Sequence, residues 1–380
     1  MITQARTCAR SAAVVAPRIK ALQWSLMLGL SLAPMALSAD VGSATTIASG
    51  LANPRGIGFA PNGALYVAEA GSGGPGPCTP SPVPPNPPRC YGETGALTRI
   101  IPNVGFERVV TGLPSLILGN GTVEGGPVDV SFLGTAPAVV IGLGGDPATV
   151  RAALPPKGAL LGTLLHATPS GAYKVVADIA GYEAAANPGG GAIDSNPYGV
   201  LAQPGRRIVA DAGGNSIIEV LANGHTRTFA VLGAPGAQTV PTSVTEGPDG
   251  AIYVGQLTGF PFFPGTASVF RISSDGGSIS TFASGFTAIV DITFDAGGAL
   301  YVLEVARGQV GPFPPPPPPN PGLGIGRLKR QCPGASPVVL LDGLTFPGGV
   351  AIGPDGAAYV TNFGTSASGE VLRLPLTPCS

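Results

Sequence analysis

The sequence predicts an all-β protein, specifically a six-bladed β-propeller of four-stranded antiparallel blades, and three observations lead to this fold. Short apolar runs alternate with turns that contain much of the 59 Gly and 42 Pro, a pattern typical of proteins with many short strands. One hairpin module recurs along the chain, which indicates a repeat architecture. With 44% hydrophobic and 11% charged residues, the chain is also too apolar for a disordered protein.

Residues 1–39 have the composition of a signal peptide. Basic residues precede an apolar segment over 21–33, and small residues follow up to Ala39, so cleavage after Ser38 or Ala39 is expected. A membrane anchor is the alternative, because the apolar segment is near the lower length limit for a span. Pro34 and the small residues favour cleavage. We therefore expect residues 40–380 to form one periplasmic or extracellular propeller domain with no stable membrane span.

The net charge of the mature chain indicates which classes of partner it can bind. Cleavage would remove four basic side chains and no acidic one, so the net charge would fall from −1 to −5. No basic cluster remains, which argues against nucleic acid as a partner. An unidentified small molecule or protein is the expected partner of a monomer. Trp24 would leave with the signal peptide, so the mature protein would contain no Trp.

The remaining cysteines suggest a disulfide framework. Cleavage removes Cys8 and leaves an even number, which in an exported chain indicates two disulfides with three possible connectivities. A zinc site is the alternative, but no CxxC pair is present. We predict Cys78–Cys90, which closes a short Pro-rich loop, and Cys332–Cys379, which joins the outer parts of the last two blades.

The repeated module is an apolar strand, a tight turn with Gly, and a second strand that often ends in Tyr-Val plus a polar residue. In these turns Pro presets φ, and a Gly such as Gly63 takes the left-handed conformation. Weaker copies begin at Val128 and Tyr198, which gives six inner hairpins. The clearest copies are 56–67, 243–254, 292–302 and 350–360.

The two ends of the chain are expected to close the ring. Residues 45–51 resemble the outer strands of other blades but have no hairpin of their own. We expect them to pair beside 370–374 in the last blade, which would hide the sheet edges. Two Pro-rich segments interrupt the blades, at 73–89 and 311–322. The second is expected to be an exposed polyproline II loop, with a ligand for a Pro-binding domain as the alternative.

Polar residues recur where inner strands start and second strands end, positions that meet on one propeller face around the axis. Converging carboxylates suit Ca²⁺ or another divalent cation, and Glu69, Asp129, Asp291 and Glu304 are the candidate metal ligands. The alternative is that these groups cap strand ends and accept hydrogen bonds from loop backbone. The complete predicted ligand site is Arg55, Glu69, Asp129, Tyr198, Asp211, Gln256, Asp291, Glu304 and Asn362.

Several segments of the mature chain resemble the ScyD/ScyE family, named for proteins associated with scytonemin biosynthesis. The resemblance covers nearly all of the mature chain and implies an exported propeller related to NHL-repeat and gluconolactonase-like propellers. It implies no catalytic residue set. The resembling segments include Asn53-Pro54-Arg55-Gly56, Gly142-Leu143-Gly144-Gly145-Asp146-Pro147, Asp194-Ser195-Asn196-Pro197-Tyr198-Gly199 and Asp211-Ala212-Gly213-Gly214-Asn215.

These observations favour an exported ligand-binding or assembly module. A metal-dependent hydrolase or lactonase of gluconolactonase type is one alternative, since a metal on the predicted face would polarise a lactone carbonyl. A purely structural scaffold is the other. The HExxH, GxSxG and Walker A motifs are absent. His166 and His225 lie in an expected outer strand and a turn, away from the polar ring, so no catalytic residue is identified.

Overall fold

The computed structural model describes residues 43–81, 87–101, 104–119, 122–259, 262–306 and 323–379. The predicted signal peptide at 1–39 and the polyproline segment at 311–322 lie outside these residues. Within the described ranges, no helix is both long and apolar enough to cross a membrane.

Antiparallel strands dominate the described part of the chain, and four of its sheets have four strands each. Three of these sheets are simple meanders, in which each strand pairs with the next along the chain. The strands are β11 (Pro197–Gln203), β12 (Arg206–Asp211), β13 (Ser216–Leu221) and β14 (Thr226–Val231); β15 (Pro241–Glu246), β16 (Ile252–Gln256), β17 (Ala267–Ile272) and β18 (Ile279–Phe286); and β19 (Ile289–Phe294), β20 (Leu300–Ala306), β21 (Leu323–Gln331) and β22 (Val338–Thr345).

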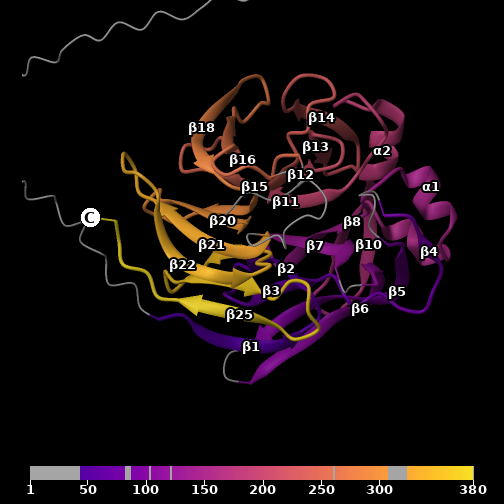
Figure 1. Cartoon of the computed structure of the whole chain (residues 1–380), viewed down its shortest axis with the longest axis horizontal. Helices are drawn as coiled ribbons and strands as arrows, with labels where there is room; N and C mark the ends of the chain where they lie inside the picture. The colour runs from indigo at the N-terminus through magenta and orange to yellow at the C-terminus, as the bar shows by residue number, and fades with distance from the viewer. Residues whose placement is uncertain are drawn as a thin grey trace, which may run out of the picture. The chain divides into compact units, whose positions relative to one another are not determined.

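The fourth of these sheets joins the two ends of the described chain. Its strand order is β1 (Thr45–Leu51), β25 (Gly369–Leu374), β24 (Ala358–Asn362) and β23 (Val350–Ile352). Strand β1 pairs antiparallel with β25, with Thr46 opposite Leu372, and the two strands lie side by side in Figure 1. This pairing is the predicted closure by an N-terminal strand.

A larger sheet of nine strands contains two successive meanders. The pairs Leu116–Gly125 and Ile117–Val123 join them, because β5 and β6 extend beyond the first meander. The strands are β2 (Pro54–Phe59), β3 (Leu65–Glu69), β4 (Cys78–Thr79), β5 (Arg89–Ile101), β6 (Gly105–Leu118), β7 (Val123–Leu133), β8 (Ala136–Gly142), β9 (Thr163–Ala167) and β10 (Tyr173–Asp178).

The first strands of the successive meanders contact one another in a closed ring. Within the described residues, β2, β7, β11, β15, β19 and β23 touch in chain order, and β23 returns to β2. The sheets therefore surround a common axis, and the fold is a β-propeller of four-stranded antiparallel blades (Figure 1). Strand β20 is buried along its whole length, as expected for blades that pack on both faces.

Short helices lie between strands of the second and third meanders, a feature that the strand pattern did not predict. Asp146 caps α1 (Pro147–Ala152) by accepting a hydrogen bond from the Ala148 amide, and Asp178 caps α2 (Ile179–Ala186). A 3₁₀ helix, η1 (Pro156–Leu160), follows α1. Arg151 and Asp178 form an ion pair of 2.7 Å between the two α-helices. With 6 and 8 residues, both are too short for a clear helical period.

Both predicted disulfides are present. Cys78–Cys90 joins β4 to β5, and Cys332–Cys379 ties the residue after β21 to the end of the described chain. The first therefore holds the Pro-rich segment against its own sheet. The second links the last two blades, as expected.

Candidate functional site

The innermost positions of the ring hold mostly small residues. Gly56 lies so close to its neighbour that a Cβ atom there would be 2.1 Å from Asp129 Oδ1. A Cβ on Gly349 would be 2.8 Å from the Gly56 Cα. Long side chains therefore fit at few of the six equivalent positions. These positions are occupied by Gly56, Asp129, Gly199, Ser243, Asp291 and Gly349.

Asp129 and Asp291 are the two acidic residues of this set, and each bridges adjacent inner strands. Asp129 accepts the amide of Val130 in its own strand and that of Val200 in β11, both at 2.8 Å. Asp291 does the same with Ile292 at 2.8 Å and with Val350 of β23 at 2.7 Å. Strands β7 and β19 are three places apart in the ring, so the two carboxyl groups approach from opposite sides of the axis.

The two carboxyl groups lie at the boundary between a small cavity and a larger channel. The small cavity, of about 10 Å³, is also lined by Tyr198 and Thr242, and it has room for about one water molecule. The channel has a volume of about 320 Å³. More polar than apolar surface lines it, although the lining residues include Phe59, Phe132, Val200, Val244, Ile292 and Val350.

Burial raises the pKa of both carboxyl groups. Loss of solvent raises the pKa of Asp129 to about 7, although its two backbone hydrogen bonds act in the opposite direction. The pKa of Asp291 is also raised well above its usual value, first by burial and then by the charge of Asp129. The titrations of the two carboxyl groups are therefore linked across the axis.

Glu69 and Glu304, predicted to share a cation with the axial aspartates, lie elsewhere. Both are 0% exposed. Glu69 pairs with Arg108 at 2.8 Å, and Glu304 pairs with Arg327 and with Lys329 at 2.8 Å. Each glutamate is thus neutralised by a basic residue from the outer half of its own blade. The structure does not bring the four predicted carboxylates together, and the described residues contain no group of three His, Cys, Asp or Glu placed to hold a metal ion.

The polar side chains at the ends of the other second strands accept hydrogen bonds from backbone amides, in agreement with the alternative that these groups cap strand ends. Asn362 accepts from the Thr345 amide at 2.7 Å, and Asp211 accepts from the Asn196 amide at 2.6 Å. Gln256 accepts from the Ser268 amide at 3.2 Å. These side chains fix the loops around each blade, so the structure brings together only Asp129, Asp291 and Tyr198 from the predicted ligand site.

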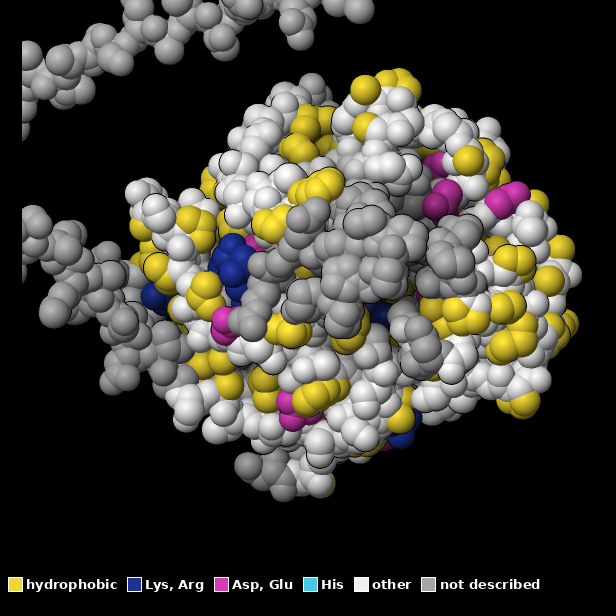
Figure 2. Space-filling model, viewed as in Figure 1, with side chains coloured by type: hydrophobic (Ala, Val, Ile, Leu, Met, Phe, Trp, Pro, Cys, Tyr) yellow, Lys and Arg dark blue, Asp and Glu magenta, His cyan; other side chains and the backbone are white. Residues whose placement is uncertain are grey.

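Arg55 also lies at an inner-strand start, where its backbone has a structural role. Its carbonyl accepts a hydrogen bond from the Thr361 hydroxyl at 2.7 Å, which ties β2 to β24. On the face drawn in Figure 2, the acidic and basic side chains of the described residues form small separate groups. This matches the low charged content of the sequence.

A second acidic group was not predicted from the repeat. Glu183 on α2 and Asp194 lie near Asp211, and burial raises the pKa of Glu183 to about 7, with Asp211 and Asp194 adding repulsion. Burial also raises the pKa of Asp211 to about 6. Glu183 lies in the inserted helix α2 and Asp194 in the loop before β11, so no repeat position identified them. The resemblance segment that begins at Asp194 was the available signal.

Comparison with solved structures supports the propeller fold. A glucose dehydrogenase-type oxidoreductase from Thermus thermophilus has a TM-score of 0.53 at 14% identity, covering 88% of this chain and 99% of that chain. The soluble aldose sugar dehydrogenase from Escherichia coli has a TM-score of 0.51 at 12% identity, covering 88% and 99%. A streptogramin B lyase has a TM-score of 0.46 at 12% identity, covering 88% and 97%. At these identities the likeness concerns the fold alone, and no family model or curated protein matches the chain.

Proposed function

We propose that this protein is an exported six-bladed β-propeller that binds a small cationic ligand in its axial channel. The observation that carries the proposal is the approach of Asp129 and Asp291 from opposite sides of the ring to one end of the axial channel. Two carboxyl groups this close repel when both are ionised, and a cation would relieve the repulsion.

The blade count rests on the inner strands. If the nine-stranded sheet is read as two blades joined at β6 and β7, each of the six inner strands begins one blade. Asp129 and Asp291 then belong to opposite blades. A channel of about 320 Å³ is within the usual size range of small-molecule sites, and Phe59 and Phe132 are among the residues that line it.

Binding is favoured over catalysis by the geometry of the two carboxyl groups. Every carboxyl oxygen of Asp129 and Asp291 already accepts a backbone amide. Each oxygen keeps a second lone pair that a bound cation can contact, whereas a general base from this pair would find no further titratable side chain among the described residues that line the channel. A gluconolactonase-type hydrolase is therefore the second choice.

Export and membership in the ScyD/ScyE family are part of the proposal. Two disulfides support an oxidising compartment, and the resembling segments support the family. Expression of the full chain followed by mass spectrometry of the secreted or periplasmic fraction should find a protein that begins at Ala39 or Asp40. A protein that keeps residues 1–39 would contradict export by cleavage.

Isothermal titration calorimetry on residues 40–380 tests the binding site, with benzylamine and CaCl₂ as separate probes. Benzylamine should bind more tightly than its neutral analogue benzyl alcohol. Asp129→Ala and Asp291→Ala should each weaken binding about tenfold or more, whereas Asp275→Ala, in an exposed turn, should not. No binding of either cation, or equal binding by all variants, would contradict the proposal. Asp129-dependent hydrolysis of glucono-δ-lactone would favour the hydrolase instead.

A further inference from the structure

Three blades share a cluster of three side chains in the same groove beside the second strand. In each blade, a turn aspartate accepts a hydrogen bond from the tyrosine of the second strand. An arginine of the third strand completes the cluster, by an ion pair with the aspartate in two blades and by a hydrogen bond with the tyrosine in the other. Tyr253 donates to Asp249 at 3.3 Å, and Arg271 pairs with the same carboxylate at 2.7 Å. The equivalent residues are Asp295, Tyr301 and Arg330, and Asp355, Tyr359 and Arg373.

The blade that begins at β7 lacks every member of this cluster. Strand register places Ala138 at the tyrosine position and His166 at the arginine position. The turn between β7 and β8 contains no acidic residue. The phenol ring and the acidic partner that occupy the groove elsewhere are therefore both missing.

The following blade adds a charge at the same place. Arg207 of β12 occupies the position held by Leu65, Ile252 or Leu300 in other second strands. Lys174 of β10 lies opposite His166 in the strand register. Three departures from the repeat thus bring nitrogen-bearing side chains into one groove between neighbouring blades.

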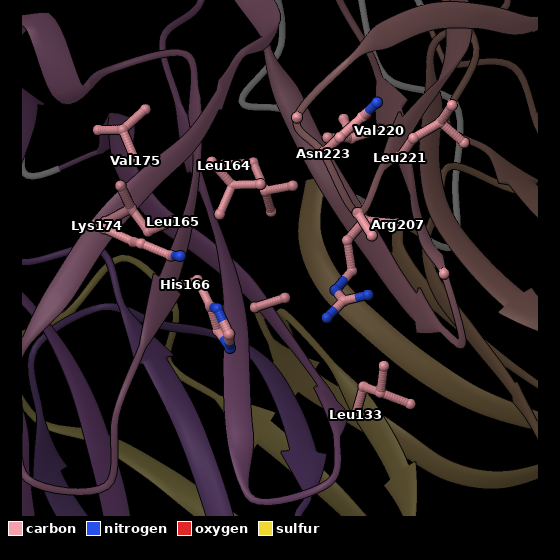
Figure 3. Close-up of a pocket in the computed structure, with 15 residues that line it drawn as sticks. Leu133, Leu164, Leu165, His166, Lys174, Val175, Arg207, Val220, Leu221 and Asn223 are labelled. Carbon is pink, nitrogen blue, oxygen red and sulfur yellow. The ribbon is translucent and has the colours of Figure 1, made fainter.

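A cavity of about 450 Å³ lies in this groove. The equivalent groove between the last and first blades also has a cavity, of about 680 Å³, but there the carboxylate of Asp355 pairs with Arg373 in the lining. In Figure 3, Lys174 and His166 lie on one side and Arg207 lies on the other, with its guanidinium directed into the space between them. No acidic residue is among the described residues that line the cavity. The apolar part of the wall consists of Leu133, Leu164, Leu165, Val175, Val220 and Leu221.

The nitrogen groups are not neutralised by the described residues around them. Arg207 donates to the backbone carbonyls of Gln203 and Arg206 at 3.1 and 2.9 Å, and no described carboxylate pairs with it or with Lys174. His166 Nε2 is buried without a hydrogen-bond partner among the described residues. Burial lowers the pKa of His166, and the positive charges of Arg207 and Lys174 lower it further. An anion would complete this arrangement electrostatically.

We propose that this inter-blade cavity binds an amphipathic organic carboxylate. The carboxylate contacts Arg207, Lys174 and His166, and the apolar body lies against the leucine and valine side chains. Cationic groups beside a mostly apolar wall are the combination that such a ligand requires. This inference uses different residues from the axial channel and is independent of the proposed function.

Titration calorimetry with decanoate tests the inference on residues 40–380. Decanoate should bind with 1:1 stoichiometry. Arg207→Gln and Lys174→Gln should each weaken binding about tenfold or more. The matched control is Arg99→Gln, because Arg99 occupies the position of His166 in another blade. It should leave the affinity unchanged.

A second variant tests the cavity separately from its charge. Ala138→Tyr places a large side chain at a residue that lines the cavity and should weaken decanoate binding, with Ala138→Leu as a smaller filling variant if the tyrosine variant does not fold. Decan-1-ol should bind more weakly than decanoate, and inorganic phosphate should not compete at equal concentration. Absence of decanoate binding, binding that survives both the charge and filling variants, or equal binding of phosphate would overturn the inference.

Discussion

The carboxyl groups of Asp129 and Asp291 face each other from opposite sides of the inner-strand ring, and each joins its strand to the next. Asp129 reaches the Val200 amide, and Asp291 reaches the Val350 amide. The same two residues thus stabilise the ring and place titratable groups at its channel.

Stability should fall as the pH rises from about 4 to about 7. The pKa of Asp129 is raised to about 7 in the folded protein, whereas an unfolded Asp has a pKa of about 3.9. Above pH 4 the unfolded chain loses this proton more readily, so the free energy of unfolding decreases, by up to about 4 kcal/mol at neutral pH. Urea unfolding at pH 4.5 and 7.5 measures the effect. The difference should shrink in Asp129→Asn, and an equal difference in that variant would contradict the assignment.

Removal of a buried glutamate charge should lower the free energy of unfolding. Glu304→Gln leaves Arg327 and Lys329 without their buried partner, and we expect a loss of about 2–4 kcal/mol in the free energy of unfolding. Glu107→Gln is the control, because its pair with Arg99 is exposed and should contribute less than about 1 kcal/mol. Similar losses in both variants by urea unfolding would argue against the buried network.

The repeat and the strand ends were largely predictable, because the turn chemistry of residues such as Gly63 is local. The partners of Glu69 and Glu304 were not. Sequence equivalence places a residue along its strand, but Arg108 is 39 residues from Glu69 and meets it only in the folded blade. Asp129 lies at the axial channel, which its place in the inner strand predicts, because inner-strand positions converge by symmetry. Glu183 was missed because its helix is an insertion outside the repeat.

The two disulfides should differ in their contribution to stability. The chain-entropy relation predicts about 4 kcal/mol for the 47-residue separation of Cys332–Cys379 and about 3 kcal/mol for the 12-residue separation of Cys78–Cys90. Urea unfolding of the Cys→Ser pairs, with mass spectrometry of non-reduced peptides, measures both. Free thiols at all four positions in the secreted protein would contradict the pairing.

A methyl group at the axis should disturb the carboxyl bridge. Gly56→Ala places Cβ at 2.1 Å from Asp129 Oδ1, so the inner strands must shift, and we expect a loss of about 1–3 kcal/mol. Gly119→Ala is the control, since no neighbouring atom lies within 4 Å of its added Cβ. If thermal unfolding shows equal stability for both variants, the close contact at the axis is not present.

The most direct test of the central claim is an NMR titration of the Asp129 and Asp291 side-chain carboxyl carbons, in the parent protein and in Asp129→Asn. If the two groups share the axis, both should titrate well above pH 4 in the parent protein, Asp129 near pH 7. The pKa of Asp291 should then fall in Asp129→Asn, because the repulsion from the Asp129 charge is gone. Ordinary carboxyl titration near pH 4 for both residues, or an Asp291 pKa that is the same in the two proteins, would contradict a linked carboxyl pair at the centre of this propeller.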